Sequence, residues 1–220
     1  MSEAAYVQSL NLVVGGLLLT AVLMLWWRQL GAIVRLLVVQ GVLLAGLAGI
    51  LAIREGDGQL YGVAAGVLLL KGIALPTVLR RVLRDGREAS ESEPLVNAAS
   101  SLLAAAFLIL FAYAVSRPLV ALAPSPATRS LPVGLSMVFL GFFLMISRRR
   151  AVSQVVGFLL MDNGIAATAF LAAAGVPLIV ELGVSLDLFL VVLVLQVLTA
   201  RMRLKFGGTD LDDLRQLRDS

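Results

Sequence analysis

The sequence contains no cysteine and no histidine in its 220 residues. Without thiolates and imidazoles, the chain lacks the usual ligands of iron–sulfur clusters, zinc and haem. Disulfides, a cysteine nucleophile and a histidine general base are excluded for the same reason. We therefore expect no catalytic residue, no metal site and no cofactor of the chain's own, and any redox chemistry would need a partner that holds the redox centre.

Charge is also scarce, since 15% of the residues are charged and 60% are hydrophobic, with a mean hydropathy of +0.97. Such values are typical of polytopic membrane proteins and exclude an ordinary soluble domain. Long apolar runs without strict alternation favour helices over a membrane β-barrel. The net charge of +4 comes from cations at the ends of these runs, where membrane topology explains them. We expect a lipid bilayer as partner and no nucleic acid.

The apolar runs predict an all-α integral membrane protein with about seven transmembrane helices, because about 20 apolar residues cross the hydrocarbon core. Pro76 predicts a kink in the third span, and Arg117-Pro118 predicts that the fourth ends near Ser116. Val176-Pro177 separates the last two spans. The expected spans are 8–27, 30–53, 61–83, 133–146 and two within 151–201. The fourth lies in the apolar stretch 95–122 and is expected to end near residue 116, before a Pro-rich loop at 123–132.

The cations predict the orientation of these spans. Most of them fall on one side of a seven-span model, in the groups 28–35, 80–87, 148–150 and 201–205, whereas the opposite loops hold only Arg54, Arg117 and Arg129. The positive-inside rule then places the N-terminus outside and the C-terminus in the cytoplasm, in a multi-pass protein of the cell inner (plasma) membrane.

The same segmentation divides the chain into four parts. Residues 1–94 hold the first three helices and a charged cytoplasmic linker, and 95–130 hold the fourth helix and the outer loop. Residues 131–206 hold the last three helices. Residues 207–220 form a tail with leucines spaced as on one face of a short helix, which fits either a partner surface or the lipid headgroups.

Ionisable side chains within the expected spans are the candidate functional residues. Acids at membrane depth are rare, costly and functional by default, since one costs at least ~2.5 kcal/mol at the bilayer centre. Each has a structural alternative: Asp162 paired with Asn163 by hydrogen bonds between helices, Glu181 at headgroup level, and Asp187 bridged to Lys71. The predicted proton or ion pathway comprises Asp162, Glu181, Asp187, Lys71 and Gln40. A glutamine such as Gln40 more often serves only as a hydrogen bond between helices.

The first and last three spans share a pattern. Twelve positions separate Arg28 from Gln40 and also Arg150 from Asp162, and in both cases small residues follow. We interpret this as a parallel 3+1+3 repeat with the fourth span as linker. The alternative is that apolar segments resemble one another without common origin.

The order of segments in the C-terminal half resembles a known family. RRRAVSQVVGFLLMDNGI, then PLIVELGVSLDLFL, then TDLDDLRQL is similar to hydrogenase-4 component E, a membrane subunit of group 4 nickel–iron (NiFe) hydrogenase and formate hydrogenlyase complexes. Spans five to seven also resemble the K subunit of complex I and the C subunit of Mrp-type antiporters. In the pattern of those proteins Asp162 stands where a glutamate would be, and Glu181 and Asp187 are candidates for the acid of the third helix.

This resemblance implies a non-catalytic subunit of an oxidoreductase complex. It implies antiporter-like membrane subunits and a peripheral iron–sulfur and NiFe-hydrogenase-like module as partners, with the buried carboxylates in a proton or ion path. Two alternatives remain at this point. A stand-alone secondary transporter would suit the repeat, but discontinuous helices are missing apart from the Pro76 region. A purely structural subunit would use the acids only to join helices.

Overall fold

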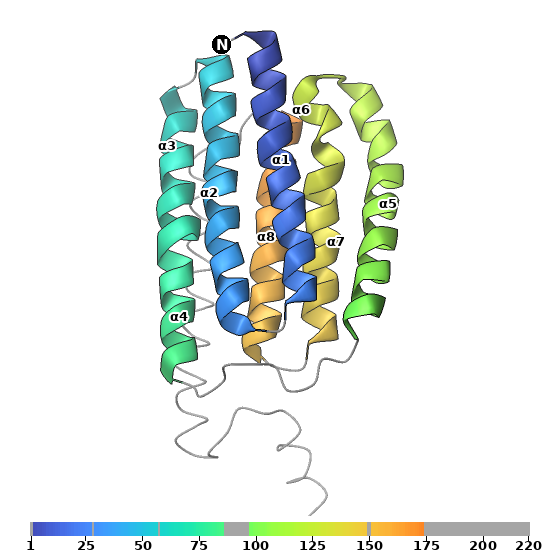
Figure 1. Ribbon diagram of the computed structural model, residues 1–220. Coiled ribbons are helices and arrows are strands. Elements are labelled where there is room, and N and C mark those ends of the chain that lie inside the picture. Colours follow the sequence, from blue (N-terminus) through green and yellow to red (C-terminus); the bar gives the residue numbers. More distant parts are fainter. Residues whose placement is uncertain (1, 28, 57, 86–96, 149–150, 174–220) are drawn as a thin grey trace, which may run out of the picture.

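The computed structural model describes residues 2–27, 29–56, 58–85, 97–148 and 151–173, and every regular element in this part is helical. The helices stand side by side in one bundle (Figure 1). Their bounds are α1 Glu3–Trp26, α2 Leu30–Glu55, α3 Gly58–Val67, the π-helix η1 Leu68–Ala74, α4 Leu75–Asp85, α5 Ala98–Leu122, α6 Pro126–Arg129, α7 Leu131–Ser147 and α8 Ala151–Ala173.

Six stretches in the described part are long and apolar enough to cross a membrane, which confirms an all-α, multi-pass membrane protein. They are 3–26, 30–55, 58–81, 98–122, 126–147 and 152–172. The seventh expected span lies outside the described residues, as do Glu181, Asp187 and the tail 207–220. The orientation and the repeat stay predictions.

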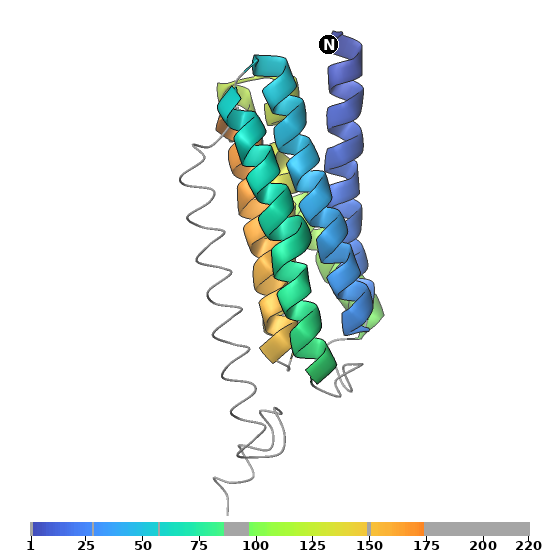
Figure 2. The same ribbon diagram turned by 90° about the vertical axis from the view of Figure 1, so that its left-hand side faces the viewer.

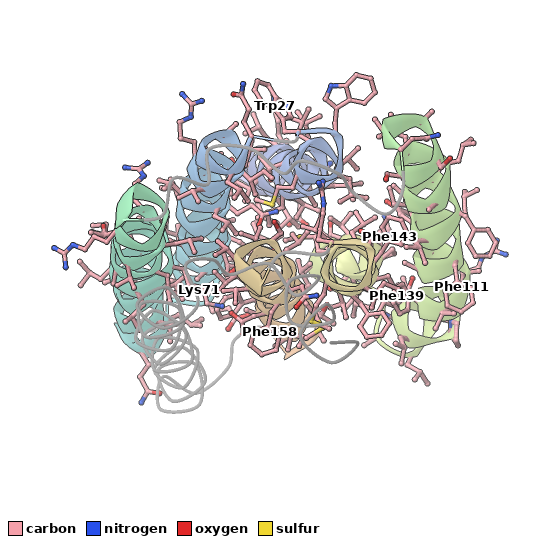
Figure 3. The ribbon with its side chains drawn as sticks, turned by 90° about the horizontal axis from the view of Figure 1, so that it is seen from below. Trp27, Lys71, Phe111, Phe139, Phe143 and Phe158 are labelled. Carbon is pink, nitrogen blue, oxygen red and sulfur yellow. The ribbon has the colours of Figure 1, made fainter. Side chains whose placement is uncertain are left out.

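Helix α8 is the element around which the others are arranged. It packs against α7 on one side and α2 on the other, and α1 fills the space between α2 and α7. Helices α3, η1 and α4 form one continuous rod beside α2 (Figure 2). At the far end, α5 packs on α7 and exposes most of its surface, with the rings of Phe111 and Phe139 5.4 Å apart (Figure 3). The residues of α8 are therefore the most enclosed in the bundle.

Glycines let α7 and α8 approach closely. Gly134 and Gly141 on α7 face Gly157 and Gly164 on α8, each pair seven residues apart and so on one helix face. A Cβ at Gly141 would lie 2.6 Å from Met161 Cα, and a Cβ at Gly157, Gly164 or Gly134 would also meet the backbone of the other helix below 3.0 Å. Van der Waals contact between backbones is a main source of helix association in lipid, where no hydrophobic driving force exists.

Two predictions around the fourth span were wrong. Helix α5 does not end near Ser116 but continues through Pro118 to Leu122. A proline removes one backbone donor, here the one that would bond the carbonyl of Ala114, and membrane helices tolerate such a loss. The 123–132 segment is not a loop throughout, because Ser125 and Thr128 form a capping box that starts α6.

The cation Arg148, interpreted from sequence only as a topology marker, is part of the bundle. It is 5% exposed, and its guanidinium donates to the carbonyls of Leu25 and Trp27, both at 3.4 Å. These carbonyls belong to the end of α1, where the last turn leaves acceptors without intrahelical donors. Arg148 thereby joins the end of α7 to the end of α1.

Substituting Gly141→Ala should destabilise the bundle by about 1–3 kcal/mol, because its methyl group would displace the backbone of α8. Gly15→Ala is the matched control, since nothing lies within 4 Å of its Cβ, and it should be neutral or stabilising by about 0.5–1 kcal/mol. Thermal unfolding of the purified protein in one mild detergent measures both. Equal melting temperatures for the two variants would contradict the close approach of α7 and α8.

Candidate functional site

A cation and an acid face each other in the interior of the bundle. Lys71 Nζ lies 2.7 Å from Asp162 Oδ2, and the two side chains are 2% and 7% exposed. Lys71 comes from the π-helix η1, and it reaches α8 from the side of the α3–η1–α4 rod (Figure 3). In low dielectric such a pair attracts strongly, but removing both ions from water costs several kcal/mol per ion.

All the polar groups of this site lie near the middle of their spans. Asp162 is 11 residues from either end of α8. Lys71 is 13 and 10 residues from the ends of the third span, 58–81, and Gln40 is 10 and 15 residues from the ends of α2. At a rise of 1.5 Å per residue, each lies about 15 Å or more from at least one end of its span. The ion pair therefore sits in the hydrocarbon core, where charges are least favourable.

An amide pair lies next to the ion pair. Asn163 Nδ2 donates to Gln40 Oε1 at 3.1 Å, which links α8 to α2. Both side chains are buried, and Gln40 Nε2 has no hydrogen-bond partner among the described residues. Asp162 and Asn163 are consecutive, so α8 presents a carboxylate to η1 and an amide to α2 at the same depth. Three spans are thus connected by polar contacts at one level.

The backbone around Lys71 is wider than an α-helix. In η1 the cap at Leu75 donates its N–H to Leu70 O, a bond over five residues as in a π-helix. Pro76 follows directly; its ring would clash with the carbonyl four residues earlier in a regular helix. The irregularity expected at Pro76 is therefore a π-helical segment. Such segments occur frequently at functional sites.

Gly41 lets α2 approach this segment. A Cβ at Gly41 would lie 2.6 Å from Gly72 N and 2.6 Å from the Lys71 carbonyl carbon and oxygen. Only a glycine admits the backbone of η1 at that distance. The residue next to Gln40 in the sequence thus sets how close Lys71 comes to the centre of the bundle.

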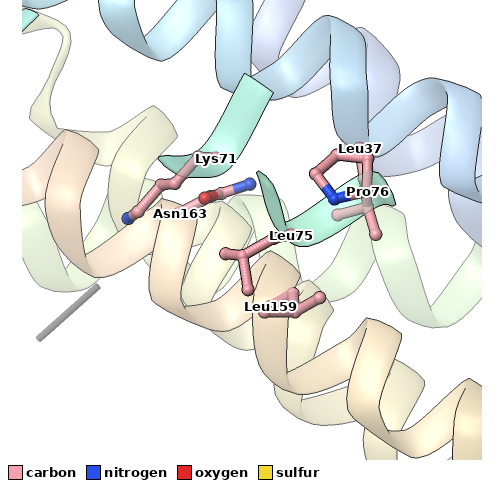
Figure 4. A pocket seen from close by; sticks show the side chains of 6 residues that line it. All are labelled: Leu37, Lys71, Leu75, Pro76, Leu159 and Asn163. Carbon is pink, nitrogen blue, oxygen red and sulfur yellow. The ribbon is translucent and has the colours of Figure 1, made fainter. Parts of the chain in front are cut away.

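A small pocket adjoins the site (Figure 4). It has room for about one water molecule. Lys71 and Asn163 supply its polar lining, and the remaining described residues around it are Leu37, Leu75, Pro76 and Leu159.

The structure brings together three of the five pathway residues expected from sequence, namely Lys71, Asp162 and Gln40. Glu181 and Asp187 lie outside the described residues. The described partner of Lys71 is Asp162, whereas the sequence had suggested Asp187 for that role. The expected hydrogen bond across helices involves Asn163 and Gln40, not a pair formed by Asp162 and Asn163.

Sequence reasoning missed Gly41 and the register that pairs Asn163 with Gln40. The only signal for Gly41 was its position directly after the one internal polar residue of the second span. Apolar spans contain many glycines, and nothing in their spacing distinguishes the one that faces the backbone of another helix.

The amino-acid sequence is similar to proteins from bacteria. The chain is 49% identical, over 222 residues and 100% of both chains, to an uncharacterized protein of Mycobacterium tuberculosis, Rv0085. It is 25% identical to hydrogenase-4 component E of Escherichia coli strain K12 and of Shigella flexneri, over 179 residues that cover 81% of this chain and 83% of those proteins. No family model matches the chain, and no solved structure matches it.

Replacing Gly41→Ala should displace η1 and weaken the site, with a loss of about 1–3 kcal/mol in stability. Gly46→Ala on the same helix is the control, since nothing lies within 4 Å of a Cβ there and alanine favours a helix by about 0.5–1 kcal/mol over glycine. Thermal unfolding in detergent measures both variants. A Gly41→Ala protein as stable as the control would contradict the close approach.

The Lys71–Asp162 ion pair should affect stability as a buried salt bridge does: removing one partner costs more than removing both. Asp162→Asn leaves the Lys71 ammonium without this counter-charge and should cost about 3–5 kcal/mol, and adding Lys71→Met should restore most of that loss. The control is Glu3→Gln, because Glu3 forms an exposed pair with Arg54 at 3.0 Å, worth less than about 1 kcal/mol.

A double-mutant cycle in detergent, read by thermal or denaturant unfolding, gives the coupling between Lys71 and Asp162. Additive losses from the two single variants would contradict a direct pairing of these side chains.

Proposed function

We propose, on the premise that this chain belongs to the family of the Mycobacterium tuberculosis protein Rv0085, that it is a membrane subunit of a hydrogenase-like complex and carries protons or ions through the Lys71–Asp162 pair. The observation that carries the proposal is the 2.7 Å contact between two ionisable side chains in the middle of the bilayer. The chain's own part is ion movement, and a partner subunit performs the redox chemistry.

Burial is the physical argument for a transfer role. A pair used only to join helices would be replaceable by apolar side chains at no loss in stability, since buried ion pairs seldom outperform them. Intramembrane ionisable residues that persist despite this cost mark ion and proton pathways. Lys71 Nζ and Asp162 Oδ2 are 2.7 Å apart, so direct proton transfer needs only a reorientation of the two groups, since Asp162 Oδ2 accepts no hydrogen bond among the described residues.

The chemistry at the pair is a sequence of proton transfers. With Lys71 as ammonium and Asp162 as carboxylate, a proton moves from Lys71 Nζ to Asp162 Oδ2, which leaves an amine and a carboxylic acid. The acid then releases its proton to the next group, and the amine takes up a proton from the other direction, which restores the charged pair.

The similarity to hydrogenase-4 component E supports the place of this subunit in an assembly. That name belongs to a hydrogenase component, and the similarity covers 81% of this chain. Antiporter-like membrane subunits and a peripheral iron–sulfur and NiFe-hydrogenase-like module are the partners we propose. Glu181 and Asp187 are proposed to continue the pathway beyond Asp162.

A purely structural role is the second candidate, and one contact favours it. The hydrogen bond from Asn163 to Gln40 joins α8 to α2 without any titratable group, as polar contacts between membrane helices commonly do. A stand-alone transporter has less support, because the third span is helical throughout its described length, without the separate half-helices of midplane transport sites.

The test begins with tagged protein purified in a mild detergent from its native membrane. Hydrogenase-type and antiporter-like subunits should copurify, and a solitary 23.3 kDa protein in repeated gentle preparations would contradict the subunit assignment. The double variant Asp162→Asn, Lys71→Met and the variant Asp162→Glu are then compared in the same host.

Asp162→Asn combined with Lys71→Met, which restores most of the stability that the single variant loses, should leave the complex assembled and its viologen-linked hydrogenase activity intact. It should reduce H2-driven proton uptake by membrane vesicles at least about tenfold. Asp162→Glu should retain part of the uptake, because it keeps a titratable carboxyl. Full proton uptake by the double variant with an intact complex would reject the pathway role and leave the structural one.

A further inference from the structure

Helix α1 carries two exposed amide side chains within its membrane span. Its buried residues face the bundle, where it packs on α2, α7 and α5, and its outer face stands at the edge of the bundle (Figure 2). Gln8 and Asn11 lie on this outer face, and neither makes a hydrogen bond within the described part of the chain. The other exposed amides among the described residues lie at the ends of spans or between them, namely Gln29, Gln59 and Asn97.

Asn11 lies too deep in the membrane for its short side chain to reach the headgroups. It is eight residues, or about 12 Å, from the first residue of α1. Because the 24 residues of α1 measure about 36 Å and the hydrocarbon core is about 30 Å thick, Asn11 lies about 9 Å inside the hydrocarbon. Lipid chains neither donate nor accept hydrogen bonds, so an amide that faces them is unfavourable. The Asn11 side chain therefore calls for a polar group from another helix.

The outer face of α1 has the spacing of a surface that pairs with another helix. A row of residues at intervals of four and three runs along it, none of them buried: Ala4, Gln8, Asn11, Gly15, Leu18 and Val22. This is the heptad spacing of two helices that cross at about 20°. The small residues Ala4 and Gly15 lie one turn beyond the two amides and leave room for a neighbouring helix. Within the described part of the chain, nothing lies within 4 Å of a Cβ at Gly15.

The surface that complements this row is the row itself. An amide both donates and accepts hydrogen bonds, so two Asn11 side chains at the same depth satisfy each other, and so do two Gln8 side chains. A two-fold axis along the membrane normal brings equal residues of two copies together at equal depth. The row contains no ionisable side chain that would require a partner of opposite charge. The chain uses the same kind of contact inside the bundle, where Asn163 donates to Gln40 at 3.1 Å.

We infer that α1 pairs with α1 of a second copy of this chain, as two parallel helices joined by hydrogen bonds between their Asn11 amides. Gln8 adds a second pair of amides one turn away, and Gly15 lets the helices approach on the other side. The inference goes beyond the proposed function and does not rest on it. The paired surface lies on the outer face of α1, whereas the Lys71–Asp162 pair lies between η1 and α8.

The absence of cysteine makes the test direct, since an introduced thiol is the only one in the chain. Gly15→Cys places a thiol on the row, twelve residues from the first residue of α1, where a Cβ has space. Leu110→Cys is the matched control, because it lies twelve residues from either end of α5 and is 70% exposed. Copper phenanthroline added to native membranes should form the disulfide-linked pair of Gly15→Cys chains at least about tenfold faster than that of the control, because pairing holds the two thiols together.

A second set of variants asks whether Asn11 holds the pair together. In the Gly15→Cys chain, Asn11→Leu should slow the linking about tenfold, because the hydrogen bonds between the amides are lost. Asn11→Gln should retain part of the linking, since its amide still donates and accepts. Both variants should keep the melting temperature of the parent chain in detergent at dilutions where the protein is monomeric.

A benzophenone maleimide on the Gly15→Cys thiol identifies the neighbour of α1 after irradiation of native membranes. With two differently tagged copies in one host, the crosslinked product should carry both tags. Crosslinks to another subunit or to lipid alone would overturn the pairing of two copies. Equal disulfide linking of Gly15→Cys and Leu110→Cys, or linking that Asn11→Leu leaves unchanged, would overturn it as well. Proton uptake enters none of these readouts, so they are independent of the test of the proposed function.

Discussion

The structure depends on a single electrostatic constraint: two opposite charges in the middle of a bilayer are tolerable only when they stay together. Lys71 and Asp162 meet this constraint at 2.7 Å, and the requirement extends to everything that sets their separation. It fixes the rotation of α8 and the position of η1 beside it. It also requires a residue without a side chain, Gly41, where α2 meets η1. The hydrogen bond from Asn163 to Gln40 connects α8 to α2 at the same depth.

Glycine provides the space for this arrangement. Gly41 admits the backbone of η1 next to α2. Two glycines on α7 and two on α8, seven residues apart on each helix, let these two helices approach closely. Since lipid supplies no hydrophobic force between helices, such close backbone contact stabilises the bundle and orients the helix that carries Asp162. The bundle thus combines a rigid α7–α8 pair with a third span whose wide π-helical turn carries the lysine.

Hydropathy predicted the class of the protein and the approximate spans, because the bilayer imposes one length and one composition on every crossing helix. Boundaries were less predictable. At Pro118 the helix continues although one backbone donor is missing, and at Ser125 a local cap starts a helix within a Pro-rich segment. The candidate residues followed from their charge, but their pairing did not. Which acid faces Lys71 depends on helix rotation, which packing determines and hydropathy does not encode.

Arg148 has a consequence for the order in which this chain is assembled. The final carbonyls of α1, those of Leu25 and Trp27, obtain a donor from a residue more than 120 positions later in the chain. During synthesis the first helices therefore reach the membrane before that donor exists, and the end of α1 relies on water at the interface until α7 has been inserted. The hydrogen bonding at the end of α1 is thus completed only when the fifth span has been inserted.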